Sequence, residues 1–149
     1  IITNHHVAGR ATRLVCRLSN REEVDAVLVG TDALSDIAII KLDLSSRRDP
    51  NAKLSVARFG DSDEVQVGDV VLAMGSPAGL SQSVTKGIVA NTAMITPGGV
   101  GTRLDGENVG ELVRWIGHDA EIYPGNSGWP FISSIGLGTV RVNSPSRVP

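Results

Sequence analysis

The chain has 149 residues, a hydrophobic content of 41% and a formal net charge of −2, which suits one domain or two small ones that share an interface. The near-neutral charge, without a basic stripe, argues against a nucleic-acid surface, and no apolar run approaches the length of a membrane-spanning helix. The single cysteine, Cys16, excludes an internal disulfide, so the fold does not depend on one.

Short β-rich segments separated by turn signals make up the first part of the chain. Residues 12–18 alternate in part between apolar and polar side chains, and residues 24–30 are expected to pair with them as a hairpin. The near-continuous apolar run Ile37–Leu42 predicts a strand that is buried on both faces. Residues 44–53 are mostly polar and indicate a loop.

The second part of the chain has the same character. Residues 54–64 are expected to connect two domains, and Thr96–Gly101 is a glycine-rich loop signal. No stretch shows sustained helical periodicity, and regularly spaced short strands favour a barrel or a sandwich. The sequence therefore predicts an all-β protein. Its further strands are expected near residues 69–74, 83–91, 110–117 and 129–132.

Three short segments carry residue types that suit nucleophilic catalysis. Ser127 lies in the glycine-rich turn Pro124–Gly128, where a hydroxyl can be exposed beside backbone N–H groups. A serine hydroxyl is a weak nucleophile, so it needs a base to take its proton and donors to hold the resulting oxyanion. His5 and His6 offer an imidazole, and Asp36 offers a carboxylate at the start of an apolar run.

The order of these residues along the chain, His then Asp then Ser, distinguishes between folds. Chymotrypsin-type double barrels have this order, whereas subtilisin and the α/β-hydrolases have two others. The sequence Gly-Asn-Ser-Gly-Trp around Ser127 also lacks the Gly-x-Ser-x-Gly elbow of the α/β-hydrolases. An esterase with that fold is therefore disfavoured.

These segments resemble the three catalytic blocks of the HtrA/Deg branch of trypsin-like serine proteases. The blocks are T-N-H-H-V, D-I-A-I-I-K-L and Y-P-G-N-S-G-W-P, and the likeness runs from residue 1 to about residue 132. The resemblance implies a chymotrypsin-like double β-barrel. Residues 1–58 would form a partial N-terminal barrel, residues 59–149 would form the C-terminal barrel, and the opening strands of the first barrel would precede Ile1.

The resemblance also implies which histidine and which carboxylate belong to the site. His6, rather than His5, matches the family's asparagine–any–histidine–valine pattern and would be the base. Asp36 would orient His6 and stabilise its imidazolium form. Asp32 and Asp43 are competing carboxylates, but neither precedes an apolar run in the same manner.

The nucleophile and the substrate pocket are expected in the second barrel. Ser127 would attack the peptide carbonyl, and the segment of Gly125, Asn126 and Ser127 would form the oxyanion hole, with the backbone N–H groups of Gly125 and Ser127 as donors. Glu121 stands where trypsin-like enzymes have the floor of the substrate pocket. It would either bind a Lys or Arg side chain or point into water, since HtrA-like pockets usually favour small aliphatic side chains. Trp129 departs from the family, which has glycine there.

The function implied by the resemblance is a serine endopeptidase that hydrolyses protein or peptide substrates through an acyl-enzyme, without a cofactor. The alternative is a catalytically impaired relative that binds unfolded polypeptides as a chaperone or scaffold; Trp129 and Arg141, both in place of glycine, support it. No metal site is expected at His118 and Asp119, because metal-ligand spacing is lacking. The family also suggests a homo-oligomer, a PDZ domain in the full-length protein, and an extracytoplasmic (periplasmic or secreted) location.

Overall fold

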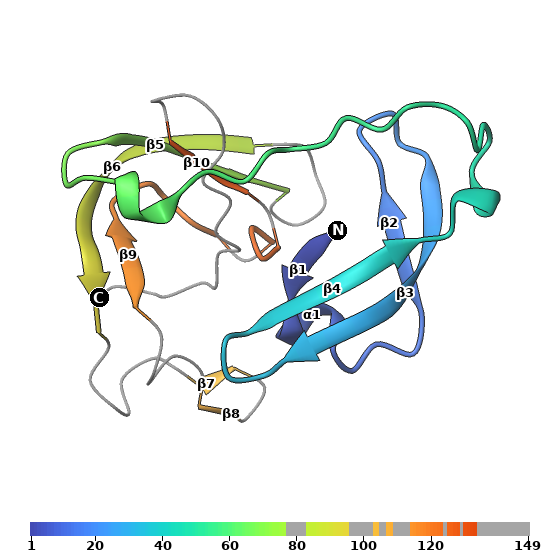
Figure 1. Ribbon diagram of the computed structural model, residues 1–149, viewed down its shortest axis with the longest axis horizontal. Coiled ribbons are helices and arrows are strands. Elements are labelled where there is room, and N and C mark those ends of the chain that lie inside the picture. The colour runs from blue at the N-terminus through green and yellow to red at the C-terminus, as the bar shows by residue number, and fades with distance from the viewer. Residues whose placement is uncertain are drawn as a thin grey trace.

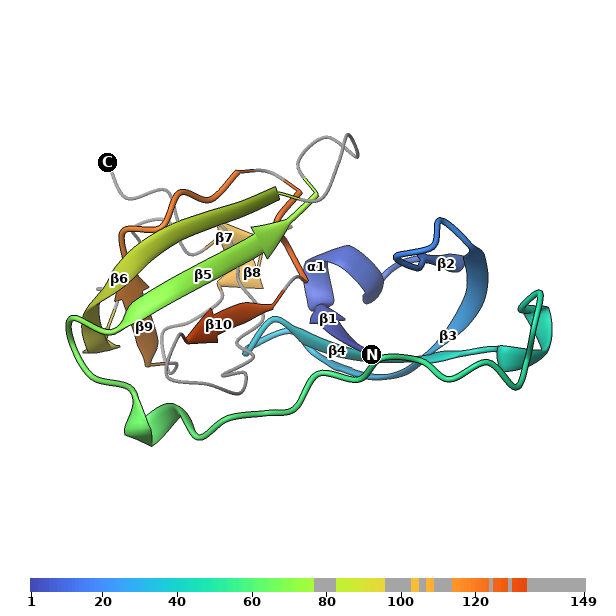
Figure 2. The ribbon, with the colours of Figure 1, turned by 90° about the horizontal axis from the view of Figure 1, so that it is seen from above.

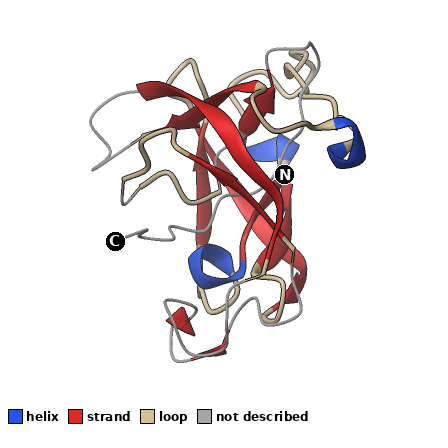
Figure 3. Cartoon of the chain, turned by 90° about the vertical axis from the view of Figure 1, so that its left-hand side faces the viewer, coloured by secondary structure: helices blue, strands red, loops and turns tan. Residues whose placement is uncertain are grey.

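The computed structural model describes residues 1–76, 83–95, 103–104, 107–108, 114–123, 125–128 and 130–133. Within this part of the chain, two four-stranded sheets form the molecule, together with one two-stranded hairpin (Figure 1). Every pair of neighbouring strands is antiparallel. The all-β prediction is confirmed, and the helices are single short turns among strands (Figure 3). None of the described helices is long and apolar enough to span a membrane.

The first sheet is formed by residues near the N-terminus, in the order β1-β4-β3-β2. The expected hairpin is present, with Cys16 opposite Val24 in its register. Leu14, Cys16 and Ala26 pack against a small apolar core. The strands are β1 (Ile2–Asn4), β2 (Leu14–Arg17), β3 (Glu23–Asp32) and β4 (Ile37–Leu42).

Strand β4 has the predicted bounds, but the prediction that it is buried on both faces is wrong. Ala38 and Ile40 are 0% and 6% exposed, whereas Ile37 and Ile39 are 41% and 47% exposed. Successive side chains of a strand point to opposite faces of the sheet. Among the described residues, the core covers only the face that carries Ala38 and Ile40.

The polar segment after β4 is anchored rather than loose. It opens with a 3-10 helix, η1 (Leu44–Ser46), and its Arg47 is buried with Nε 3.9 Å from Glu22 Oε2. The backbone N–H of Arg48 donates to Glu22 Oε1 at 2.6 Å, and this hydrogen bond lowers the pKa of the Glu22 carboxyl. The segment is thereby held against the turn between β2 and β3.

The second sheet has the order β10-β5-β6-β9. Its predicted strands are present with shifted bounds: β5 (Val70–Gly75), β6 (Ser83–Met94), β9 (Trp115–His118) and β10 (Phe131–Ser133). The separate hairpin of β7 (Arg103–Leu104) and β8 (Glu107–Asn108) was not predicted, and Thr96–Gly101 lies outside the described residues. The core of this sheet is formed by Val65, Val71, Ala73, Val89, Ala120 and Phe131.

Each of the two sheets packs on its own apolar core. The connection from the first sheet to the second continues after η1 as an irregular segment with a second 3-10 turn, η2 (Ser62–Glu64). In Figure 2, β1, which is the edge strand of the first sheet, and the short helix α1 (His5–Ala8) lie on the side that faces the second sheet, beside the orange segment that leads to β10. The division of the chain into barrels at residue 58 stays a prediction.

Candidate active site

The pairing of β1 with β4 brings a histidine segment to a buried aspartate. Asn4 lies opposite Ile37 in the register, so α1 begins beside Asp36. The backbone N–H of His5 donates to the carbonyl oxygen of Asp36 at 3.0 Å. The N–H of His6 donates to Asp36 Oδ1 at 2.9 Å. The first turn of α1 therefore holds both the backbone carbonyl and the carboxylate of Asp36.

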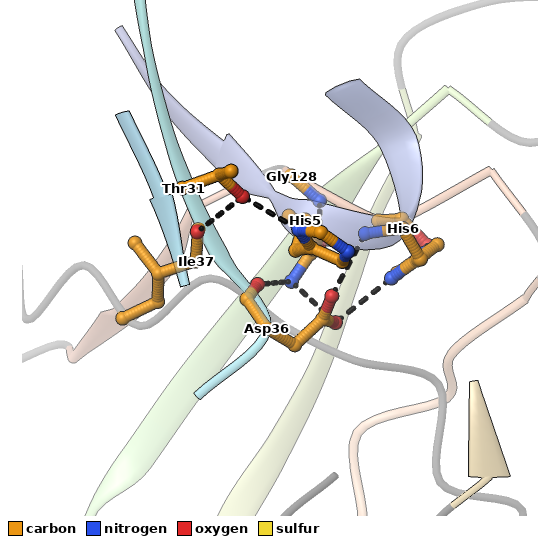
Figure 4. A network of polar contacts seen from close by, with 8 residues as sticks. His5, His6, Thr31, Asp36, Ile37 and Gly128 are labelled. Atoms are coloured by element: carbon orange, nitrogen blue, oxygen red, sulfur yellow. Dashed lines mark hydrogen bonds and ion pairs between the residues drawn. The ribbon is translucent and has the colours of Figure 1, made fainter. Parts of the chain in front are cut away.

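The carboxylate of Asp36 also holds the imidazole of His6. Asp36 is 1% exposed, and its backbone has a φ of 56°, in the left-handed region that aspartate adopts more readily than most residues. Its Oδ2 lies 2.8 Å from His6 Nδ1, and Figure 4 shows the carboxylate pointing toward the ring. Since a carboxylate only accepts, the proton of a neutral His6 is on Nδ1.

The other nitrogen of His6 faces the serine. His6 Nε2 lies 3.1 Å from Ser127 Oγ, although the two residues are 121 positions apart. With the proton of His6 on Nδ1, Nε2 is free to accept the serine hydroxyl proton. The structure thus brings His6, Asp36 and Ser127 together in one line of hydrogen bonds, and the His6 side chain is only 17% exposed.

The serine loop is a tight turn between two glycines with positive φ. Gly125 has a φ of 106° and Gly128 a φ of 79°, conformations that other residues rarely adopt. Among the described residues, the N–H groups of Gly125 and Ser127 donate to no protein acceptor. The N–H of Asn126 donates to the carbonyl of Tyr123 at 3.0 Å, so it is already engaged. Asn126, which belongs to the predicted oxyanion segment, therefore has no free N–H, and the role of the Gly125 and Ser127 N–H groups as donors stays a prediction.

Asn126 instead has a packing role in the loop. It is 2% exposed, and its side chain lies so close to Gly75 that a Cβ on that glycine would collide with it. The N–H of Ser76 also donates to the carbonyl of Gly125 at 3.4 Å. The end of β5 and the serine loop therefore fix each other.

Glu121, the predicted pocket residue, is exposed in the structure. Its carbonyl oxygen accepts a hydrogen bond from Thr85 Oγ1 at 2.7 Å. Its carboxylate is a hydrogen-bond partner of the Tyr123 hydroxyl, and this bond raises the pKa of Tyr123. The role of Glu121 in a pocket stays a prediction.

The alternative histidine and carboxylates, His5, Asp32 and Asp43, have other hydrogen-bond partners. His5 Nδ1 lies 2.6 Å from Thr31 Oγ1, and Thr31 in turn donates to the carbonyl of Ile37 (Figure 4). Asp32 accepts a hydrogen bond from the Ser35 hydroxyl and Asp43 one from the Ser45 hydroxyl; these bonds lower the pKa of each carboxyl. Neither carboxylate hydrogen-bonds to His6 among the described contacts.

One residue of the site was not singled out from the sequence. Asn4 is 1% exposed, and its side chain contacts both Asp36 and Gly128. Its only signal was its place in the T-N-H-H-V segment, two positions before His6. Trp129 and Arg141, the two departures from the family, lie outside the described residues.

The sequence of the chain is similar to those of known proteins. The family model of the trypsin-like peptidase domain matches residues 1–137. A probable periplasmic serine endoprotease DegP-like of Pseudomonas putida (strain F1) is 38% identical over 144 residues, which cover 97% of this chain and 26% of that protein. A probable periplasmic serine protease do/HhoA-like of Haemophilus influenzae is 35% identical over 150 residues, covering 98% and 29%. The chain thus spans between a quarter and a third of the length of these curated relatives.

The fold of the chain is also similar to those of solved structures. The structure of the HtrA-type protease AlgW with a decapeptide matches this chain with a TM-score of 0.74 and 32% sequence identity, over 92% of this chain and 37% of that one. The structure of AlgW with a tripeptide has the same TM-score. The predicted chymotrypsin-like, HtrA-type fold is therefore confirmed.

Proposed function

The chain belongs to the trypsin-like serine peptidases, in their HtrA/Deg branch, and on that premise we propose that it is the catalytic part of a serine endopeptidase. The observation that carries this proposal is the line of hydrogen bonds from Asp36 through His6 to Ser127, at 2.8 Å and 3.1 Å. A base within hydrogen-bond reach of the nucleophile, itself oriented by a third group, is the geometry of nucleophilic catalysis.

In the proposed reaction, Ser127 Oγ attacks the carbonyl carbon of the peptide bond while His6 Nε2 takes the serine proton. His6 then gives that proton to the leaving amine, and an acyl-enzyme on Ser127 remains. Water then attacks the acyl carbon while His6 Nε2 takes one of its protons. The bond between that carbon and Ser127 Oγ breaks, His6 returns the proton to Oγ, and the product leaves with its new carboxyl group. Asp36 stays ionised throughout and stabilises the imidazolium form of His6.

The oxyanion formed at each step requires donors that are already in position. We assign the N–H groups of Gly125 and Ser127 to this role, since neither has another acceptor among the described residues. Removing one such donor from a protease costs about 10²–10³ in kcat. The positive φ of Gly125, 106°, supports this assignment because it lets the backbone turn sharply beside the substrate carbonyl.

The expected substrates are proteins or peptides, in keeping with the endoprotease names of the relatives and the peptides bound to AlgW. The relatives are named as periplasmic, which supports an extracytoplasmic location for this protein. A PDZ domain and a homo-oligomer in the full-length protein remain proposals that rest on the family alone.

A fluorophosphonate probe tests the proposed function directly. It should label the native protein, because only a serine activated by a base reacts rapidly with the probe. Ser127→Ala should abolish labelling, and Ser55→Ala, an exposed serine in the connection between the sheets, should leave it unchanged. Equal labelling of the parent and the Ser127→Ala variant would contradict the proposal. Polypeptide binding without any labelling would instead favour the non-catalytic relative.

Glu121 gives a prediction about substrate preference. If its carboxylate faces the substrate, peptides with Lys before the cleaved bond should have a kcat/KM about two- to fivefold above those with Val, because an exposed charge pair contributes little. Glu121→Ala should remove this difference, which competition assays with paired peptides measure. Tyr123→Phe is the matched control, because it removes the hydroxyl beside Glu121 and keeps the charge. Equal use of Lys and Val peptides by the parent excludes the pairing.

A further inference from the structure

We propose that Asn4 is a positioning residue of the active site. Its side-chain amide joins the carboxylate of Asp36 to the loop that carries Ser127, and so aligns both with His6. This inference rests on the proposed function, but it concerns a residue outside the triad. Asn4 precedes α1 without capping it through its side chain, so its polar groups are available for other partners.

The contacts of Asn4 span the two parts of the site. Asn4 Nδ2 donates to the carbonyl oxygen of Asp36 and to Asp36 Oδ2, each at 3.1 Å. The N–H of Gly128 donates to Asn4 Oδ1 at 2.7 Å, between residues 124 positions apart. One buried side chain therefore contacts the aspartate of the first sheet and the residue next to the serine.

The chemistry of these contacts requires an amide. Asp36 presents two acceptor oxygens and Gly128 presents a donor, so the residue between them must donate on one side and accept on the other. The reversed amide would oppose oxygen to oxygen and N–H to N–H. A carboxylate would repel Asp36, and an aliphatic side chain would take one donor from Asp36 Oδ2 and the acceptor from the Gly128 N–H.

The contact with Asp36 acts on the atom that holds the histidine. Asp36 Oδ2 accepts from both Asn4 Nδ2 and His6 Nδ1. The second bond of Nδ2, to the backbone carbonyl, braces Asp36 in its left-handed conformation with φ 56°. Losing the amide would leave the carboxylate held only by the N–H of His6 at Oδ1 and by His6 Nδ1 at Oδ2, so the direction of the His6 ring would be less tightly fixed.

The contact with Gly128 depends on a close approach of the serine loop to β1. Gly128 has a φ of 79°, and a Cβ at this position would collide with Oγ1 of Thr3. The loop is therefore near enough for Asn4 to accept its N–H. Because Gly128 follows Ser127 directly, this bond limits how far the nucleophile can move from His6.

The test uses two Asn4 variants of the full-length protein and one matched control. Asn4→Leu keeps the approximate shape and removes both contacts, while Asn4→Asp keeps the acceptor for Gly128 and replaces the donor with a second carboxylate. Asn20→Ala is the control, because Asn20 likewise donates to a carboxylate, Glu22, and accepts from a backbone N–H, far from the site. Peptide hydrolysis is measured at the same pH for every variant, with active-site titration to count competent serines.

Both Asn4 variants should lower kcat per competent serine by about 10- to 100-fold while KM changes less than about twofold, since misalignment of reacting groups acts on the chemical step. Asn20→Ala should retain the parent kcat. A kcat within about twofold of the parent in either Asn4 variant, or a loss that disappears after titration, overturns the proposal.

A second readout does not depend on turnover. Nitrogen NMR of histidine-labelled protein reports which ring nitrogen of His6 carries the proton, with His6→Gln used for assignment. The parent should show the proton fixed on Nδ1, and both Asn4 variants should show exchange between the two tautomers. If the parent hydrolyses no peptide, the proposed function fails while this measurement still decides the role of Asn4. An unchanged tautomer in both variants overturns it.

Discussion

Replacing His6 with alanine is expected to lower kcat about 10⁶-fold, the loss seen when a serine protease loses its base. His6 Nε2 is the nitrogen within 3.1 Å of Ser127 Oγ, and the serine hydroxyl has no comparable acceptor among the described residues. Substrate binding does not require the imidazole, so KM should change little. Steady-state hydrolysis of a peptide substrate by the purified variants measures both constants.

Two further variants make this expectation specific. His5→Ala changes the adjacent histidine, whose ring is directed to Thr31, and should leave kcat within about twofold of the parent. The double variant His6→Ala, Ser127→Ala should be no slower than either single variant, because the members of a triad act as a unit. A His6→Ala variant that keeps more than about 1% of the parent kcat would show that another group takes the serine proton.

The strands and the three segments of the site could be predicted because their signals are local. Alternating side chains and turn residues specify β2 and β3 within a few positions, and His6, Asp36 and Ser127 each lie in a short motif. The burial of β4 could not be predicted in the same way. The run Ile37–Leu42 is apolar on both faces, and composition does not say which face is covered by other elements.

The finer structure of the site depends on contacts between distant segments. The role of Asn4 requires that Gly128 lies against it, and nothing near position 4 indicates that partner. The hydrogen bond of the Asn126 N–H could not be predicted for a related reason. Whether the N–H of Asn126 is free depends on its turn with Tyr123, and every residue of a loop has the same backbone groups in the sequence. The motifs in the sequence therefore indicate the type of reaction, whereas contacts between distant segments determine which backbone and side-chain atoms are available for it.

Replacing Asp36 with asparagine is expected to lower kcat about 10⁴-fold, as it does for the corresponding aspartate of a trypsin-type triad. Asp36 accepts from the backbone N–H of His6 at Oδ1, and from His6 Nδ1 and Asn4 Nδ2 at Oδ2. An asparagine has one oxygen for these donors. If that oxygen stays with the backbone N–H, the new NH₂ group faces Nδ1 and donates to it. The proton of His6 then moves to Nε2, which can no longer accept from Ser127.

The opposite orientation of the new amide is disfavoured. Its NH₂ group would then face the backbone N–H of His6, and these two donors would lie together without an acceptor. We therefore expect a low kcat with nearly unchanged KM, and NMR should show the His6 proton on Nε2. Asp32→Asn is the control, since Asp32 accepts from Ser35 and does not reach His6; its kcat should equal that of the parent. Thermal unfolding of both variants separates lost catalysis from lost fold. A folded Asp36→Asn variant with a kcat within about tenfold of the parent would mean that the serine proton is removed without a fixed His6 tautomer.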